Sequence, residues 1–146
     1  MDRTVPRPMN WNGTEYHIQL SSEETGGCIG IFSSVCPPES GPPRHVHEAE
    51  DETFHVLSGE ALFWLAGAEQ VAQAGETVFV PRGVEHAFRV IGPRPARMLT
   101  ILTPGGFEGF FREMAEGQYR IPEDMAAIGA IGARYNMTFT GPPLAA

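Results

Sequence analysis

Two histidines one residue apart, His45 and His47, stand in the stretch PPRHVHEAEDETFHVLSG that spans residues 42–59. On an extended segment, side chains two positions apart point to the same face, so both imidazoles can reach one point in space. Glu52 follows on the next apolar stretch, where it shares a face with Phe54 and Val56. This spacing predicts two imidazoles and one carboxylate that can share a metal ion.

A lone carboxylate in a protein interior is costly to bury unless it is paired, protonated or bound to a cation. The stretch GETVFVPRGVEH, residues 75–86, adds a strand, a turn and His86 at the start of the next strand, which makes His86 a candidate fourth ligand. We interpret Glu48, Glu50 and Asp51 as loop acids. His55 has the opposite parity from Glu52, so we expect it to point outward or into an interface. The alternative is a solvated loop with a salt-bridged acid, and a turn histidine at position 86.

Short strands separated by turn residues account for most of the chain from residue 14 onward. The first, TEYHIQL at residues 14–20, alternates apolar and polar positions and places His17 on the polar face. Further strands are expected at residues 28–35, 53–58, 60–66, 69–74, 76–81, 86–91 and 96–103. Strands that recur every 8 to 12 residues or so are typical of an antiparallel sandwich or barrel.

After Pro104 the pattern changes, because apolar residues recur three and four positions apart in residues 106–117 and 122–136. This period predicts two helices, with Pro122 in the first helical position of the second helix. We expect one domain over residues 1–146, with a barrel core at about 14–104 and a C-terminal helical extension at about 105–146.

The chain resembles the cupins in two motifs, which it matches in residue types and in gaps. The matching residues are Gly41, His45, His47, Glu52 and Gly59, followed by Gly75, Pro81, Gly83 and His86. The resemblance extends over residues 41–104, and the continuation ILTPGGFEGFF is similar to small bacterial quercetin-dioxygenase-like members. Val90 and His55 depart from the usual pattern, in which asparagine and tyrosine are common there.

The resemblance implies an all-β fold, an antiparallel jelly-roll β-barrel with a short C-terminal helical extension. It also implies that His45, His47, Glu52 and His86 bind one divalent metal per chain. Three imidazoles and one carboxylate suit Fe, Mn, Ni, Co, Cu or Zn, whereas Mg and Ca prefer shells of oxygen ligands. Four protein ligands leave positions open for substrate or dioxygen on a metal that takes six.

The function that this resemblance implies is a metal-dependent dioxygenase for a small aromatic, phenolic or enolic substrate. Glu52 is then both a ligand and the candidate catalytic residue, as acceptor of a substrate hydroxyl proton. The same four ligands also suit a metal-assisted isomerase, epimerase or lyase, in which the cation polarises a carbonyl. A non-catalytic cupin that binds a metal and a small ligand is the third hypothesis.

Charge and composition restrict the other function classes. The formal net charge of −8 and the absence of a basic run make nucleic acid or an anionic membrane an improbable partner. All ten basic residues are arginine, which excludes Schiff-base lysines and serine/lysine dyads. The segment MDRTVPRPMN has no apolar core that fits a secretion signal, so we expect a cytoplasmic protein. We also expect a homodimer, because a small barrel must cover its outward apolar residues and because members of the family that it resembles often form dimers.

The remaining cysteines and aromatics have less specific roles in these expectations. Cys28 and Cys36 are expected to be buried as small hydrophobic residues. Phe63, Phe79 and Phe88 are expected in the core or at the barrel mouth. Phe107, Phe110 and Phe111 are likewise expected in the core, and the alternative is a helix pair that covers the barrel mouth and excludes water.

Overall fold

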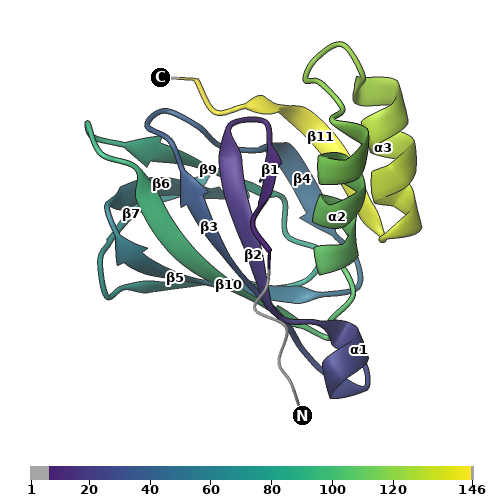
Figure 1. The fold of residues 1–146 in the computed structure, drawn as a ribbon. Coiled ribbons are helices and arrows are strands. Elements are labelled where there is room, and N and C mark those ends of the chain that lie inside the picture. Colours follow the sequence, from purple (N-terminus) through teal and green to yellow (C-terminus); the bar gives the residue numbers. More distant parts are fainter. Residues whose placement is uncertain (1–6, 146) are drawn as a thin grey trace.

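A computed structural model of the chain describes residues 7–145. Residues 1–6 and residue 146 lie outside the described part. Residues 1–6 belong to the segment in which no secretion signal is expected. Strands form two antiparallel sheets that face each other, and the helices lie at one side (Figure 1). None of the helices in the described part is long and apolar enough to cross a membrane.

The larger sheet has six strands. In spatial order they are β1 (Met9–Trp11), β2 (Thr14–Leu20), β3 (Gly30–Cys36), β10 (Ala96–Thr103), β5 (Asp51–Ser58) and β8 (Thr77–Val80). The smaller sheet has five strands, in the order β11 (Met137–Pro143), β4 (Pro43–His47), β9 (His86–Ile91), β6 (Glu60–Leu65) and β7 (Ala68–Gln73). From β3 to β10 the chain passes repeatedly from one sheet to the other, which confirms the jelly-roll prediction.

Three helices complete the fold: α1 (Ser22–Thr25), α2 (Glu108–Gly117) and α3 (Met125–Arg134). Both predicted C-terminal helices are present, but α3 begins at Met125 and not at Pro122. The chain then returns as β11, which pairs with β4 in the smaller sheet. The C-terminal extension is therefore helical only in part, since its last strand belongs to the barrel.

The motif glycines allow close approaches between backbone segments. A Cβ on Gly41 would collide with the Phe88 carbonyl of β9. Gly59 has a φ of +77°, and a Cβ there would lie 2.6 Å from the carbonyl oxygen of Pro95. These two positions hold the ends of β4 and β5 against their neighbours, which fixes the strands that carry the candidate ligands.

Two hydrophobic clusters fill the interior. The first lies between the sheets around Phe54, Val56, Phe63 and Met98, and the second packs the helices against the larger sheet. The buried part of the second cluster consists of Trp11, Phe32, Leu102, Phe107, Phe110, Met114, Ile128 and Met137.

The predicted burial of individual side chains is only partly correct. Phe63 is core as expected, but the prediction for Phe79 is wrong, because its side chain points outward and is 55% exposed. Cys36 is buried, whereas Cys28 is exposed, so the prediction for Cys28 is also wrong.

Candidate metal centre

The structure brings three of the sequence-predicted residues together. His45 and His47 occupy alternate buried positions of β4, and His86 is the first residue of the neighbouring strand β9. One ring nitrogen from each of the three imidazoles lies within 4.8 Å of the others. Their exposed fractions are 7%, 2% and 2%, so the three rings converge inside the barrel.

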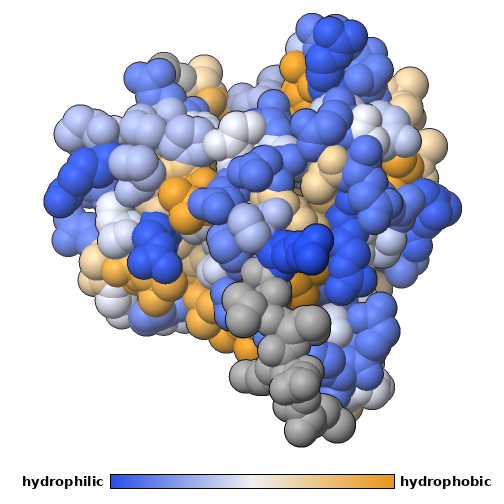
Figure 2. Space-filling model, in the orientation of Figure 1, coloured by the Kyte–Doolittle hydropathy of each residue, from blue (hydrophilic) through white to orange (hydrophobic). Residues whose placement is uncertain are grey.

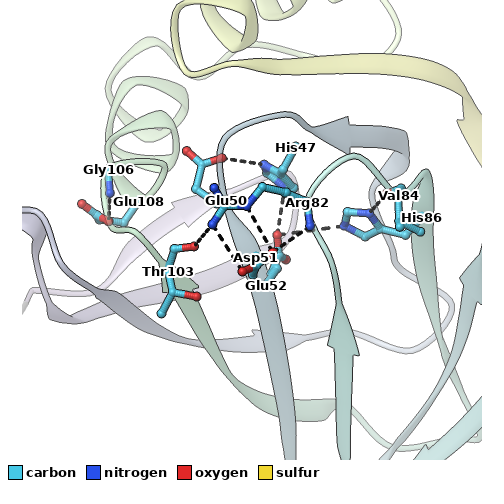
Figure 3. Close-up of polar contacts among 10 residues, drawn as sticks. All are labelled: His47, Glu50, Asp51, Glu52, Arg82, Val84, His86, Thr103, Gly106 and Glu108. Carbon is cyan, nitrogen blue, oxygen red and sulfur yellow. Dashed lines mark hydrogen bonds and ion pairs between the residues drawn. The ribbon is translucent and has the colours of Figure 1, made fainter.

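Backbone carbonyls orient two of these rings. The Nδ1–H of His45 donates to the carbonyl oxygen of Pro43 at 2.7 Å. The Nδ1–H of His86 donates to the carbonyl oxygen of Val84 at 2.9 Å, as Figure 3 shows. Because a carbonyl can only accept, each ring carries its proton on Nδ1. Nε2 then keeps a free lone pair, as metal-binding histidines require.

Glu52 contributes the carboxylate beside the histidines. It lies on β5 in the opposite sheet, and its Oε2 is 2.9 Å from His47 Nε2 and 4.0 Å from His86 Nε2. Burial favours the protonated carboxyl, but the charge of His47, its hydrogen bond to the carboxylate, and the charges that His86 and His45 acquire in acid outweigh it and lower the pKa of Glu52 to about 2. Glu52 is therefore an ionised carboxylate at neutral pH, in the position that its strand parity predicts.

The histidines differ in protonation because their surroundings differ. Burial, with repulsion from His86 and His47, lowers the pKa of His45 to about 3. Burial also lowers the pKa of His86. Burial has the same effect on His47, but the carboxylates of Glu52 and Glu50 outweigh it and raise the pKa of His47. Two neutral imidazoles and one imidazole that attracts a proton thus surround one carboxylate.

The donor set fits a divalent cation. Among the described residues, His86 Nε2 is buried without a hydrogen-bond partner, and Glu52 Oε2 has no hydrogen bond of normal geometry although it lies 2.9 Å from His47 Nε2. Such atoms normally cost stability when they are removed from water, and a cation between them would satisfy both. Three imidazoles and one carboxylate match the ligand preference of Fe, Mn, Co, Ni, Cu or Zn and not that of Mg or Ca.

Glu50 was missed as part of this site. Glu50 lies in the loop between β4 and β5, as interpreted, but its side chain is buried and its Oε2 lies 3.8 Å from His47 Nδ1. It lies beside the ring nitrogen that Glu52 does not contact (Figure 3). Burial raises the pKa of Glu50. Nothing in the sequence marks this acid, since it follows the bend at residues 48–49, where strand periodicity is absent.

The other residues near the motif are placed as surface residues. Glu48 is exposed, and Asp51 pairs with Arg82 at the surface, with 3.3 Å between Asp51 Oδ2 and Arg82 Nη2. His55 is on the outer face of β5, where its Nδ1 lies 2.8 Å from the hydroxyl of Thr77. His55 therefore does not face the candidate metal centre, as its parity predicts.

A cavity opens beside the metal centre, where the two hydrophobic clusters meet. Its volume is about 90 Å³, well above the roughly 10–15 Å³ that one water requires, so it can admit a small molecule. His45, His47 and Glu52 line it at one place, and much of the remaining wall is aromatic. The aromatic wall consists of Trp11, Tyr16, Phe32, Phe54, Phe88, Phe107, Phe110, Phe111 and Phe139.

The segment from Phe107 into α2 closes one side of this cavity. The ring of Phe107 meets His47 edge to face, with centroids 4.3 Å apart, and stacks on Phe110 at 5.1 Å. Phe110 in turn contacts Trp11 of β1 at 6.0 Å. Phe107 and Phe110 are buried core residues, as expected, and both also belong to the cavity wall.

Comparison with known proteins agrees with the two motifs. A family profile described as "Cupin domain" matches residues 33–102. An oxalate-binding protein from Thermotoga maritima is 30% identical over 104 residues, which cover 68% of this chain and 86% of that protein. The chain belongs to the cupin family.

Two further similarities concern an enzyme and a solved structure. The cupin is 31% identical over 105 residues to quercetin 2,3-dioxygenase from Bacillus subtilis, which covers 71% of the chain but only 31% of the length of that enzyme. It also resembles the structure of KdgF from Halomonas sp., with a TM-score of 0.63 and 14% identity over 70% of the chain and 90% of that protein. The second similarity shows the fold alone.

Proposed function

We propose that this cupin is a metal-dependent dioxygenase that acts on a small aromatic, phenolic or enolic substrate. The observation that carries the proposal is the convergence of His45, His47, His86 and Glu52 at a point where all but His86 line an aromatic-walled cavity. The similarity to a quercetin 2,3-dioxygenase supports the reaction class, although the chain spans about a third of that enzyme. When bound by these four residues, one divalent transition metal would supply the redox chemistry and the site for substrate or dioxygen.

The protein residues around the metal would bind and orient the substrate. The aromatic wall offers flat apolar surfaces for a ring, and Phe107 shields the His47 side of the centre from water. Glu52 is proposed first as a ligand. A carboxylate with a pKa of about 2 is a weak proton acceptor, so its second proposed role, in taking the proton of a substrate hydroxyl, needs a separate test.

A second candidate is a non-catalytic cupin that binds a metal and a small ligand. The observation in its favour is the Thermotoga relative, which is named an oxalate-binding protein and is covered over 86% of its length. In that case the cavity would hold its ligand without turnover.

Elemental analysis and oxygen uptake separate these candidates. Protein purified without added metal should contain one redox-active divalent ion per chain and should consume oxygen with at least one member of a panel of phenols, enediols and flavonols. Full occupancy without oxygen consumption on any member would favour the binding protein. In Glu52→Gln, metal retained with turnover lost would identify a proton acceptor, whereas metal lost would identify a ligand.

We also propose that the protein is a homodimer, which associates through the outer face of the larger sheet. Phe79, Thr53, Ile101 and Ile31 lie opposite one another across four neighbouring strands of this face. Phe79 is 55% exposed and Leu57 is 43% exposed, which is unusual for large apolar side chains. Apolar patches interrupt the hydrophilic surface at the lower left of Figure 2, where Figure 1 places β5 and β10.

A further inference from the structure

A second group of polar side chains lines the cavity away from the histidines. Thr14 and Tyr16 occupy alternate positions of β2, and Ser34 and Cys36 occupy alternate positions of β3, so all four point to the interior of the sheet. Thr14, Ser34 and Cys36 are 7%, 4% and 3% exposed. We call these four residues the distal polar patch.

Strand register places this patch at a distance from the metal centre. Along β10, Leu102 pairs with Glu52, while Met98 pairs with Ser34. Four residues separate the two levels, which corresponds to about 14 Å at roughly 3.4 Å per residue. Cys36 is one pair further along, opposite Ala96. The metal centre and the distal polar patch therefore lie at different levels of one cavity.

Aromatic side chains form most of the wall between these two levels. Phe32 and Phe54 line the cavity there on either side of Thr100, whose buried hydroxyl is a polar group at this level. The ring of Phe111 stacks on the ring of Tyr16, with centroids 4.4 Å apart and planes inclined by 26°. A ligand that spans the cavity thus meets a polar end, a mainly aromatic middle and a second polar end.

The distal polar patch offers hydrogen bonds without charge. Among the described residues that line the cavity, the ionisable imidazoles and the carboxylate belong to the metal centre, and no arginine is present. Burial raises the pKa of the Cys36 thiol and of the Tyr16 phenol, so both stay protonated at neutral pH. Hydroxyl groups both donate and accept, and the Cys36 thiol donates to Ser34 Oγ at 3.5 Å. This chemistry suits a neutral hydroxyl or carbonyl group and disfavours an anion.

We propose that Thr14, Tyr16, Ser34 and Cys36 form a second binding subsite for an uncharged hydroxyl or carbonyl group at the far end of an elongated aromatic ligand. The inference rests on the proposed function, because the near end of that ligand is taken to reach the metal. It narrows the substrate class to molecules with polar groups at both ends of a flat apolar body. Single-ring phenols and small enediols lack the second group.

A matched pair of ligands tests this subsite. The first is a catechol that carries a phenyl ring, and the second differs only by a para hydroxyl on that far ring. Calorimetric titration into zinc-loaded protein gives both dissociation constants without turnover, because zinc has no redox chemistry. We expect the extra hydroxyl to tighten binding about tenfold in the wild-type protein, as one well-placed hydrogen bond does.

Two variants decide which face of the sheet causes the preference for the hydroxylated catechol. In the double variant Tyr16→Phe/Ser34→Ala, the tenfold preference should fall to about unity, with the phenyl catechol bound as before. Ser33→Ala is the matched control, because Ser33 has the adjacent position on β3 and faces the other side of the sheet. It should keep the preference. Equal affinity of the two catechols in the wild-type protein, or a preference that survives the double variant, would overturn the proposal.

The metal dependence of binding is measured separately, so the two proposals can fail independently. If His47→Ala binds both catechols as tightly as the wild-type protein, the metal-dependent function fails, while the ratio of the two constants still reports on the subsite. Tryptophan fluorescence locates the ligand, because Trp11 lines the cavity and Trp64 does not. Trp64 lies instead beside Arg44, with 4.8 Å between the guanidinium carbon and the centre of the Trp64 ring. In a Trp64→Phe background, binding should quench Trp11. Absence of binding of either catechol to the wild-type protein would overturn the subsite proposal.

Discussion

His45 and His86 lie directly opposite each other on the neighbouring strands β4 and β9, with ring centroids 4.3 Å apart. Residues opposite each other in antiparallel strands have fixed spacing, so the sheet itself holds these two imidazoles in place. His47 joins them from the next inward position of β4. The candidate centre is therefore built on strands and depends little on loop conformation.

Replacement of His86 by alanine should abolish stoichiometric metal binding. The substitution removes one of the converging imidazoles and leaves Glu52 with fewer partners. Elemental analysis of the purified variant measures the loss. His55→Ala makes the same chemical change on the outer face of β5 and should retain the wild-type metal content. Full occupancy in a His47→Ala/His86→Ala double variant would show that the metal is bound elsewhere.

Glu50→Gln should weaken metal affinity by about tenfold or more, the usual effect of losing a carboxylate beside a ligating histidine. Glu50 lies 3.8 Å from His47 Nδ1 and raises the pKa of that ring, which increases its basicity toward a metal. Competition with a chromophoric chelator measures the affinity. Glu48→Gln is the control, because Glu48 is exposed and should behave as wild type. Equal affinities in the two variants would exclude the role of Glu50.

Metal-free protein should lose stability as the pH falls below about 6.5. The folded-state pKa of His45 is about 3, below its ordinary value of 6.5, so the unfolded chain binds more protons between these limits and acid favours unfolding. At about pH 5 this effect amounts to roughly 2 kcal/mol. His86, with its lowered pKa, acts in the same direction. The stability that His47 contributes, through its raised pKa, is already at its full value below the ordinary pKa of 6.5 and does not change as the pH falls further. The stability that Glu52 contributes, through its lowered pKa, is lost only below its ordinary pKa of 4.5.

Urea unfolding of chelator-treated protein at several pH values checks this dependence. The variant His45→Gln should show a flatter decline between pH 6.5 and 5 than the wild-type protein. His17→Gln replaces a partly exposed histidine on the polar face of β2 and should keep the full decline. An unchanged slope in His45→Gln would contradict the assignment.

Phe79→Asp should shift the protein from dimer to monomer. The substitution places a charge on the apolar outer face of the larger sheet, where burial against a second copy would desolvate it. Light scattering at micromolar concentration gives the mass. Val71→Asp is the matched control, since Val71 is 48% exposed but belongs to the smaller sheet. A wild-type protein that is monomeric under these conditions would refute the dimer.

Strand parity and turn spacing were enough to predict most of the barrel and the candidate ligands. His45, His47 and Glu52 follow from the period of two, and the strands at 14–20, 86–91 and 96–103 agree with the structure at both ends. Phe79 shows the limit of the method. In its strand, TVFV, every residue after Thr77 is apolar, at inward and outward positions alike. Without alternation, the sequence does not say which face is buried.

The remaining errors have tertiary causes. The last strand, β11, was missed because Gly141, Pro142 and Pro143 look like a turn, and Pro is tolerated there only because β11 is at the edge of its sheet. Thr14 and Ser34 are polar residues at inward positions, and residue type alone assigns such residues to the surface. Only the register between β2, β3 and β10 shows that they face a cavity.

The pairing of β11 with β4 has a consequence for the order of folding. Met137 pairs with His47 and Phe139 pairs with His45, so the outer neighbour of the strand that presents two candidate ligands comes from a distant part of the sequence. Without β11, β4 would be an open edge with β9 as its only neighbour in the sheet. Contacts between residues far apart in sequence form late because closing a long loop costs entropy, so we expect both histidines to be fixed in place only in the last stage of folding.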